Sequence, residues 1–127
     1  MRKSTVFIHW IAFAAVVIIF GYAGLRKVIL ENTMVQAMDE MGFNVPWTLA
    51  IGIAEVLGVL FMLYGIKNAR WKSIGALLLL PFAIGAFTTH MAHNEYHHYQ
   101  QSLWMCILIP IVLATTKGFR IILAQNQ

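Results

Sequence analysis

Apolar residues are gathered in four long runs, which cover residues 6–25, 47–66, 73–92 and 101–118. A helix that crosses a bilayer needs about 20 mostly apolar residues. The first three runs have that length, and the fourth reaches it only when its apolar centre is extended at both ends. The pattern predicts an all-α membrane protein, a four-helix transmembrane bundle that forms a single domain over residues 1–127.

The loop between the first two runs, residues 26–45, predicts a short amphipathic helix on the outer surface of the bundle. Thr33 and Gln36 fit the S/T-x-x-E/Q capping box. Gly42 suits the position after a helix C-terminus. The expected helix has an apolar face and an acidic face, formed by Met34, Val35, Met38 and Met41 on one side and by Asp39 and Glu40 on the other.

The composition agrees with a membrane protein rather than a soluble one. The chain is 60% hydrophobic and 11% charged, whereas soluble domains have about 25% charged residues. One cysteine, Cys106, excludes an intrachain disulfide and a CxxC redox pair. A redox role would therefore use a group other than a thiol pair of this chain.

The distribution of basic residues predicts the orientation of the bundle. With four spans, seven lysines and arginines share one side, and two, Arg26 and Lys27, lie on the other. We expect both termini in the cytoplasm. Tryptophans near the ends of the runs fit interfacial anchors, and His9 fits an interfacial residue. The seven basic residues are Arg2, Lys3, Lys67, Arg70, Lys72, Lys117 and Arg120, with the middle three expected in the turn after the second run.

Glu55 is the candidate with the most information, because it is a carboxyl group in the middle of an apolar run. It follows Trp47 by eight residues, which places it roughly 12 Å into the membrane. An ionisable residue at that depth is a functional hypothesis by default. The alternative is a protonated glutamate that bonds a neighbouring helix. Gly52, Gly58, Val59 and Met62 lie toward the same side of the helix.

Lys27 and His90 complete a candidate cluster with Glu55 in the outer half of the bundle. Gly24 leaves room beside Lys27, and His90 ends a small-residue stripe, Ala76, Leu79, Ala83 and Ala86, on the third run. The three groups would neutralise their charge, relay protons, or hold an anionic or quinone-like head group. The alternative is a structural ion pair.

The stretch FTTHMAHNEYHH holds four of the five histidines. On a continuing helix His93 and His97 are four residues apart and would share a metal ion. Histidines at a membrane surface are also explained by hydration alone. We expect the hydrated helix end and keep a metal site at His93 and His97 as an alternative.

These residues resemble those of the DoxX family. GYAGLRKVI, with Gly24 and Lys27, is similar to a small-Gly-x-x-Lys signature of that family, and IGIAEVLGVL, with Glu55, is similar to its Gly-x-x-Glu pattern. GALLLLPFAIGAFTTH, ending in His90, is similar to its Gly-Ala…Thr-His pattern. The resemblance covers residues 13–119. The histidines after His90 and the lack of a cysteine pair depart from that pattern.

The resemblance implies a small four-helix protein of the bacterial inner (plasma) membrane. Members of the family include a membrane subunit of a thiosulfate:quinone oxidoreductase, a protein of another oxidoreductase complex and, among distant animal relatives, an assembly chaperone for receptors. Membership therefore does not settle whether the chain is an enzyme.

The leading hypothesis is an accessory subunit of a quinone-linked membrane redox system, with Lys27, Glu55 and His90 in a polar pocket. One alternative is a scaffold or assembly chaperone for a larger membrane protein, and another is metal handling through histidines. Quinone is the expected cofactor and no metal is expected. The expected partners are the lipid bilayer and a protein of the same complex, without nucleic acid. Glycine-rich faces on the second and third helices permit a homo-oligomer.

Overall fold

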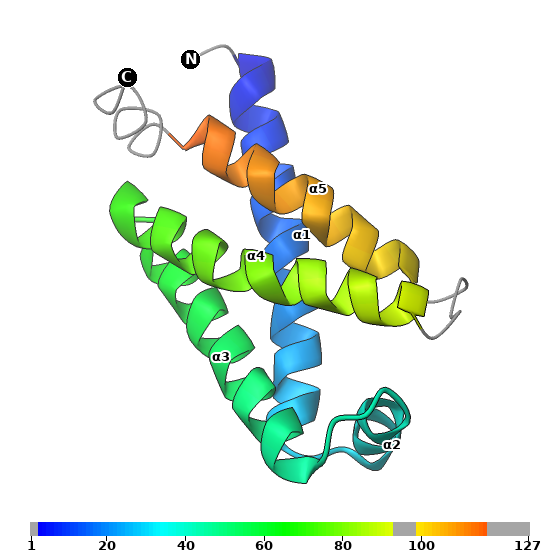
Figure 1. Ribbon diagram of the computed structural model, residues 1–127. Coiled ribbons are helices and arrows are strands. Elements are labelled where there is room, and N and C mark those ends of the chain that lie inside the picture. The colour runs from blue at the N-terminus through cyan, green and yellow to red at the C-terminus, as the bar shows by residue number, and fades with distance from the viewer. Residues whose placement is uncertain (1–2, 93–98, 117–127) are drawn as a thin grey trace, which may run out of the picture.

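The computed structural model describes residues 3–92 and 99–116, and this part of the chain forms five α-helices (Figure 1). No strand occurs among these residues. The helices are α1 (Lys3–Val28), α2 (Asn32–Glu40), α3 (Val45–Tyr64), α4 (Ala69–Ala92) and α5 (Tyr99–Thr115).

Three of the five helices are long and apolar enough to cross a membrane. They are α1, α3 and α4, with 26, 20 and 24 residues. α5 has 17 residues and is shorter than the three candidate spans. The chain is therefore an all-α membrane protein, and three of its four predicted spans have the length of a crossing within the described residues.

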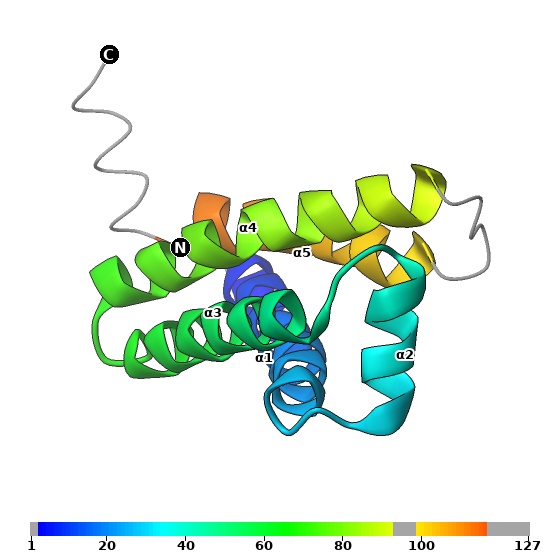
Figure 2. The same ribbon diagram turned by 60° about the horizontal axis from the view of Figure 1, so that its bottom comes forward.

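The four long helices pack in a ring of neighbours, in which α1 contacts α3 and α5, and α4 contacts α3 and α5. α4 and α5 lie side by side, and α1 crosses them steeply (Figure 1). The start of α1, the turn between α3 and α4, and the end of α5 lie toward one end of the molecule, called here the basic end. α2 lies at the opposite end, beside the end of α1 and the start of α3 (Figure 2).

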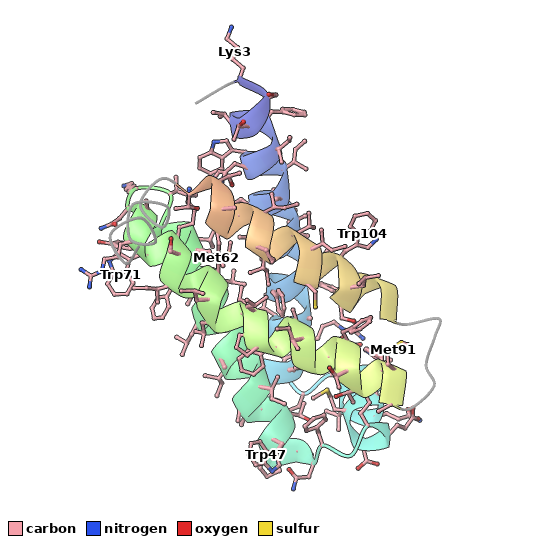
Figure 3. All side chains as sticks on the ribbon, turned by 45° about the horizontal axis from the view of Figure 1, so that its top comes forward. Lys3, Trp47, Met62, Trp71, Met91 and Trp104 are labelled. Carbon is pink, nitrogen blue, oxygen red and sulfur yellow. The ribbon has the colours of Figure 1, made fainter. Side chains whose placement is uncertain are left out.

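The core is formed by apolar side chains from the four long helices, while many other apolar side chains face outward. Met62 lies inside, and Trp47, Trp71 and Trp104 point outward (Figure 3). Ile18 is 67% exposed in the middle of α1, as expected for a surface that lipid tails cover. The core residues are Ala12, Phe13, Val16, Phe20, Val59, Met62, Ala76, Leu79, Ala83, Met105, Ile109, Val112 and Leu113.

α3 and α4 approach closely where two glycines face each other. A Cβ atom on Gly75 would lie 2.5 Å from the carbonyl oxygen of Gly58, a distance that no real side chain tolerates. Small residues at such a crossing let two membrane helices pack backbone to backbone. The predicted inward side of α3 is confirmed, because Gly52, Glu55, Gly58, Val59 and Met62 are all buried.

The amphipathic helix α2 is confirmed, but its predicted capping box is wrong. α2 begins at Asn32, so Glu31 rather than Thr33 is the N-cap residue, and no side chain caps the helix there. The Glu31 carboxylate accepts hydrogen bonds from Arg26 instead. The predicted C-terminal glycine is confirmed, because Gly42 follows α2 with φ +95°. Met38 is buried, and Asp39 and Glu40 are exposed.

Two polar residues are placed differently from the prediction. Lys72 lies inside α4 and is 7% exposed, because α4 begins at Ala69 and its first turn carries Lys72 onto the inner face. His9 is 6% exposed and faces the inside of the bundle, where Lys72 and Thr115 hydrogen-bond its ring. The sequence predicts a basic turn between α3 and α4, whereas in the structure Lys72 of that segment is buried.

Candidate functional site

Lys27 and Glu55 form an ion pair inside the bundle. The Nζ atom of Lys27, near the end of α1, donates to both carboxylate oxygens of Glu55 in α3, each at 3.0 Å. Lys27 is 8% exposed and Glu55 is 4% exposed. The structure therefore brings together two of the three residues of the predicted cluster. They lie 28 positions apart in the chain.

Two glycines make this pair possible, and they act reciprocally. Gly52 of α3 faces Lys27 of α1, because a Cβ atom on Gly52 would lie 2.6 Å from the Lys27 Cβ. Gly24 of α1 faces Glu55 of α3, with 3.2 Å from its would-be Cβ to the Glu55 Cβ. α1 and α3 run in opposite directions, so a glycine one turn before each charged residue leaves room for the charged residue of the other helix. This arrangement explains both Gly-x-x-Lys and Gly-x-x-Glu.

The pair adds no net charge to the membrane interior. Removing two charges from water costs several kcal/mol per ion, and their attraction offsets that cost only with good geometry. Here the geometry is good, because one ammonium lies at equal distance from both oxygens of the carboxylate. A lysine ammonium has three N–H groups, and the two Glu55 oxygens account for at most two of them. One Lys27 N–H therefore remains for a further acceptor.

The ion pair borders a cavity of about 440 Å³. Residues of α1, α2, α3, α4 and α5 line the cavity. The end of the bundle that carries α2 is seen in Figure 2. Its size falls within the range of small-molecule sites, which are mostly apolar with a few placed polar groups. The apolar wall includes Ile19, Phe20, Met34, Met38, Met41, Phe43, Ile51, Phe82 and Met105, and the polar lining includes Lys27, Glu40, Glu55, Thr89, His90 and Ser102.

His90 lies on the wall of the same cavity, at the end of the small-residue stripe of α4. Ala76, Leu79 and Ala83 of that stripe are buried. Ala86 and His90 line the cavity one and two turns further on. The stripe predicted this inward face correctly, and α4 thereby carries His90 to the cavity that Lys27 and Glu55 border.

Ser102 and Thr89 line the cavity without having been singled out in the sequence, and the methionines of α2 were not predicted to belong to the site. Ser102 is 7% exposed in the first turn of α5. Its hydroxyl at the start of an apolar run was the one sequence feature that could have marked it as a site residue. The apolar face of α2 was predicted, but only the folded chain shows that Met34 and Met38 form part of this wall. Methionine is flexible and polarizable, so such a wall adapts to different ligand shapes.

The histidines proposed as metal ligands, His93 and His97, lie outside the described residues. Within residues 3–92 and 99–116 no group of three or more histidine, cysteine, aspartate or glutamate side chains is placed to hold a metal ion. The metal alternative therefore stays a prediction for the 93–98 segment.

Comparison with known proteins adds one finding. A family model described as the DoxX-like family matches residues 11–114, a range that includes Lys27, Glu55 and His90. No curated protein and no solved structure matches the chain.

Proposed function

This chain belongs to the DoxX-like family, and we propose that it is an accessory subunit of a membrane redox system, which holds a quinone-like head group beside Lys27 and Glu55. The observation that carries the proposal is a buried ion pair that borders an apolar-walled cavity. A quinone has the matching chemistry, because its ring is flat and apolar and its two carbonyl oxygens accept hydrogen bonds.

Each polar group has a role in this proposal. Lys27 donates its remaining N–H to one quinone oxygen and keeps its charge balanced by Glu55. His90, on the α4 wall, is the second proton site, and Ser102 offers a hydroxyl on the α5 wall. The electrons come from a partner protein of the same complex, since this chain has a single cysteine.

The proposed topology has four crossings, with α5 as the fourth and both termini on the cytoplasmic side of the bacterial plasma membrane. α5 packs along α4 and α1, which supports a crossing at the same depth. Its 17 residues span about 26 Å at 1.5 Å per residue, somewhat less than a hydrocarbon core of about 30 Å. In the four-span pattern of the sequence, seven basic residues share one side of the membrane and two lie on the other, and this distribution favours the orientation.

The test is the quinone content of untagged protein purified from membranes, measured by extraction and chromatography. Wild type is expected to retain quinone at close to one per chain, and Glu55→Gln to lose most of it. Glu31→Gln is the matched control, because Glu31 pairs with Arg26 outside the cavity and its variant is expected to keep the quinone.

Wild-type protein that carries no quinone would contradict the proposal, and so would equal retention by Glu55→Gln. Co-purification of a large membrane protein in the absence of quinone would then favour the scaffold or assembly role. In that case Glu55 would act as a contact between helices.

A further inference from the structure

A second buried cation, Lys72, lies at the basic end of the bundle, away from the Lys27 cavity. Its Nζ atom lies 3.0 Å from Nε2 of His9. It also lies 4.4 Å from the centre of the Trp10 ring, within the range of a cation–π contact. Neither neighbour carries a negative charge. Lys72 thus differs from Lys27, whose charge a carboxylate balances.

The hydrogen bonds around His9 run in one direction. A lysine ammonium only donates, so Nε2 of His9 accepts from Lys72. Nδ1 then carries the ring proton and donates to Oγ1 of Thr115 at 2.7 Å, and that hydroxyl donates to the Ile111 carbonyl at 2.6 Å. With Lys72 as the ammonium, this arrangement leaves His9 neutral and the positive charge on Lys72.

Within residues 3–92 and 99–116, no acidic side chain forms an ion pair with Lys72. The sequence has five acidic residues. Glu31 and Glu55 are paired with Arg26 and Lys27. Asp39 and Glu40 belong to α2 at the opposite end, and Glu95 lies outside the described residues. A buried charge without a partner is strongly unfavourable, which indicates that an anion from outside the chain completes the site.

A hollow of about 200 Å³ lies beside Lys72, and it is lined by Val6, His9, Trp10, Ala69, Lys72, Thr115 and Thr116. Since one water occupies about 30 Å³ of liquid, this space accommodates a phosphate group. The first turn of α4 starts at Ala69, and the positive end of a helix dipole also favours an anion there. Exposed Arg70, next to Ala69 of the lining, raises the positive potential around the hollow.

The apolar surface next to the hollow favours a lipid over a free ion. Val6 is 40% exposed and Trp10 is 41% exposed, and both line the hollow. These side chains would contact the acyl chains of a lipid whose phosphate sits at Lys72. Basic pockets between membrane helices are suited to anionic head groups.

We propose that the hollow beside Lys72, His9 and Trp10 binds the phosphate group of an anionic phospholipid. This proposal does not depend on the quinone site, because the two cavities have no lining residue in common.

Native mass spectrometry tests the proposal directly on the wild-type protein in detergent. With equal amounts of phosphatidylglycerol and phosphatidylcholine, we expect about tenfold more bound phosphatidylglycerol, a difference of about 1.4 kcal/mol. Both lipids carry the phosphate, but the choline cation of phosphatidylcholine is repelled by Lys72 and cancels the charge of its own phosphate. Equal occupancy by the two lipids would overturn the proposal.

Three variants test whether the preference for phosphatidylglycerol depends on Lys72. Lys72→Met is expected to lose it and Lys72→Arg to keep most of it. Lys67→Met is the matched control, since it removes an exposed cation of the same end and is expected to keep the preference. If Lys67→Met lowers the preference as much as Lys72→Met, the general potential of the basic end is responsible and the site is refuted.

A comparison with inorganic phosphate distinguishes a phospholipid head group from a free phosphate ion as the occupant of the hollow. We expect an upward shift of the thermal midpoint with phosphatidylglycerol that 10-fold more inorganic phosphate does not reproduce. An equal shift with inorganic phosphate, absent in Lys72→Met, would overturn the lipid as occupant and assign the site to a free anion.

Discussion

Gly52 of α3 packs directly against Lys27 of α1, and only a glycine fits at position 52. A Cβ atom on Gly52 would lie 2.6 Å from the Cβ atom of Lys27 and 3.1 Å from the carbonyl oxygen of Gly24. The neighbours are backbone and the root of a side chain, neither of which moves away easily. The contact between α1 and α3, and with it the ion pair, depends on this position.

Gly52→Ala is expected to lower the free energy of unfolding by about 1–3 kcal/mol, the usual cost of overpacking, and to weaken any ligand bound beside Lys27. Gly21→Ala on α1 is the control, because its Cβ would meet Val59 at an ordinary 3.8 Å. That variant is expected to be neutral or slightly stabilising, since alanine is the better helix former. Thermal and denaturant unfolding in detergent measure both. Equal effects of the two variants would refute the close contact.

Removing one partner of the Lys27–Glu55 pair is expected to destabilise far more than removing both. Glu55→Leu leaves a buried ammonium unpaired and should cost about 3–5 kcal/mol, and Lys27→Met leaves the carboxyl unpaired at a similar cost. The double variant places two apolar side chains of similar volume at the crossing, and its stability is expected to return close to that of wild type. A double-mutant cycle of unfolding measurements checks this. Additive losses would show that the pair is not coupled.

The exposed Arg26–Glu31 pair offers a test of pH dependence with a known sign. Hydrogen bonds from Arg26 lower the pKa of Glu31 below its usual value of 4.5. The stabilisation by the carboxylate is therefore complete above pH 4.5 and is lost as the pH falls through the lowered pKa. The difference in thermal midpoint between wild type and Glu31→Gln should shrink below pH 4.5 and with added salt. A difference that grows on acidification would contradict the pairing.

Leu30 and Gly42 occupy equivalent positions after α1 and α2, yet only one of them is glycine. Glu31 N–H donates to the Arg26 carbonyl at 3.0 Å and Phe43 N–H donates to the Met38 carbonyl at 2.8 Å, the same Schellman bond at both helix ends. Leu30 has φ 54°, a conformation that costs a residue with a Cβ about 1–2 kcal/mol.

Leu30→Gly is therefore expected to raise the free energy of unfolding by about 1 kcal/mol, while Gly42→Ala is expected to lower it by a similar amount. Nothing lies within 4 Å of a Cβ at Gly42, so the effect there reports backbone conformation rather than a clash. Thermal unfolding in detergent measures both variants. A loss of stability in Leu30→Gly would show that the leucine side chain contributes more than the backbone conformation costs.

The proposed orientation predicts which loops reagents reach from outside the cell. In a Cys106→Ala background, Asn32→Cys at the start of α2 should react with a membrane-impermeant maleimide in intact spheroplasts. Ile66→Cys, in the exposed turn between α3 and α4, should react only after lysis. The opposite pattern would invert the bundle, and labelling of both positions from outside would rule out α3 as a single crossing.

Much of this architecture follows from the sequence by itself, because apolar runs of sufficient length have few alternatives in a bilayer. Three of the four predicted spans have the length of a crossing helix, and α2 and the glycine that ends it were also predicted. Gly-x-x-Lys and Gly-x-x-Glu were recognisable as patterns, and Lys27, Glu55 and His90 were singled out as polar groups in or at the ends of apolar runs. These features depend on local periodicity and on the free-energy cost of placing charge in lipid. Both can be recognised within one helix, without knowing how it packs against the others.

The tertiary structure decided which polar groups meet. From the sequence, Lys72 was one of several cations expected in a turn, and His9 was expected at the membrane interface. In the structure, the packing of α1, α4 and α5 brings the two side chains together. The residues of that cluster are 63 and 106 positions apart in the chain, so no spacing rule connects them. The antiparallel crossing of α1 and α3 likewise sets each glycine against the other helix's charge. Contacts between distant segments depend on how helix surfaces fit, and only the folded chain shows that fit.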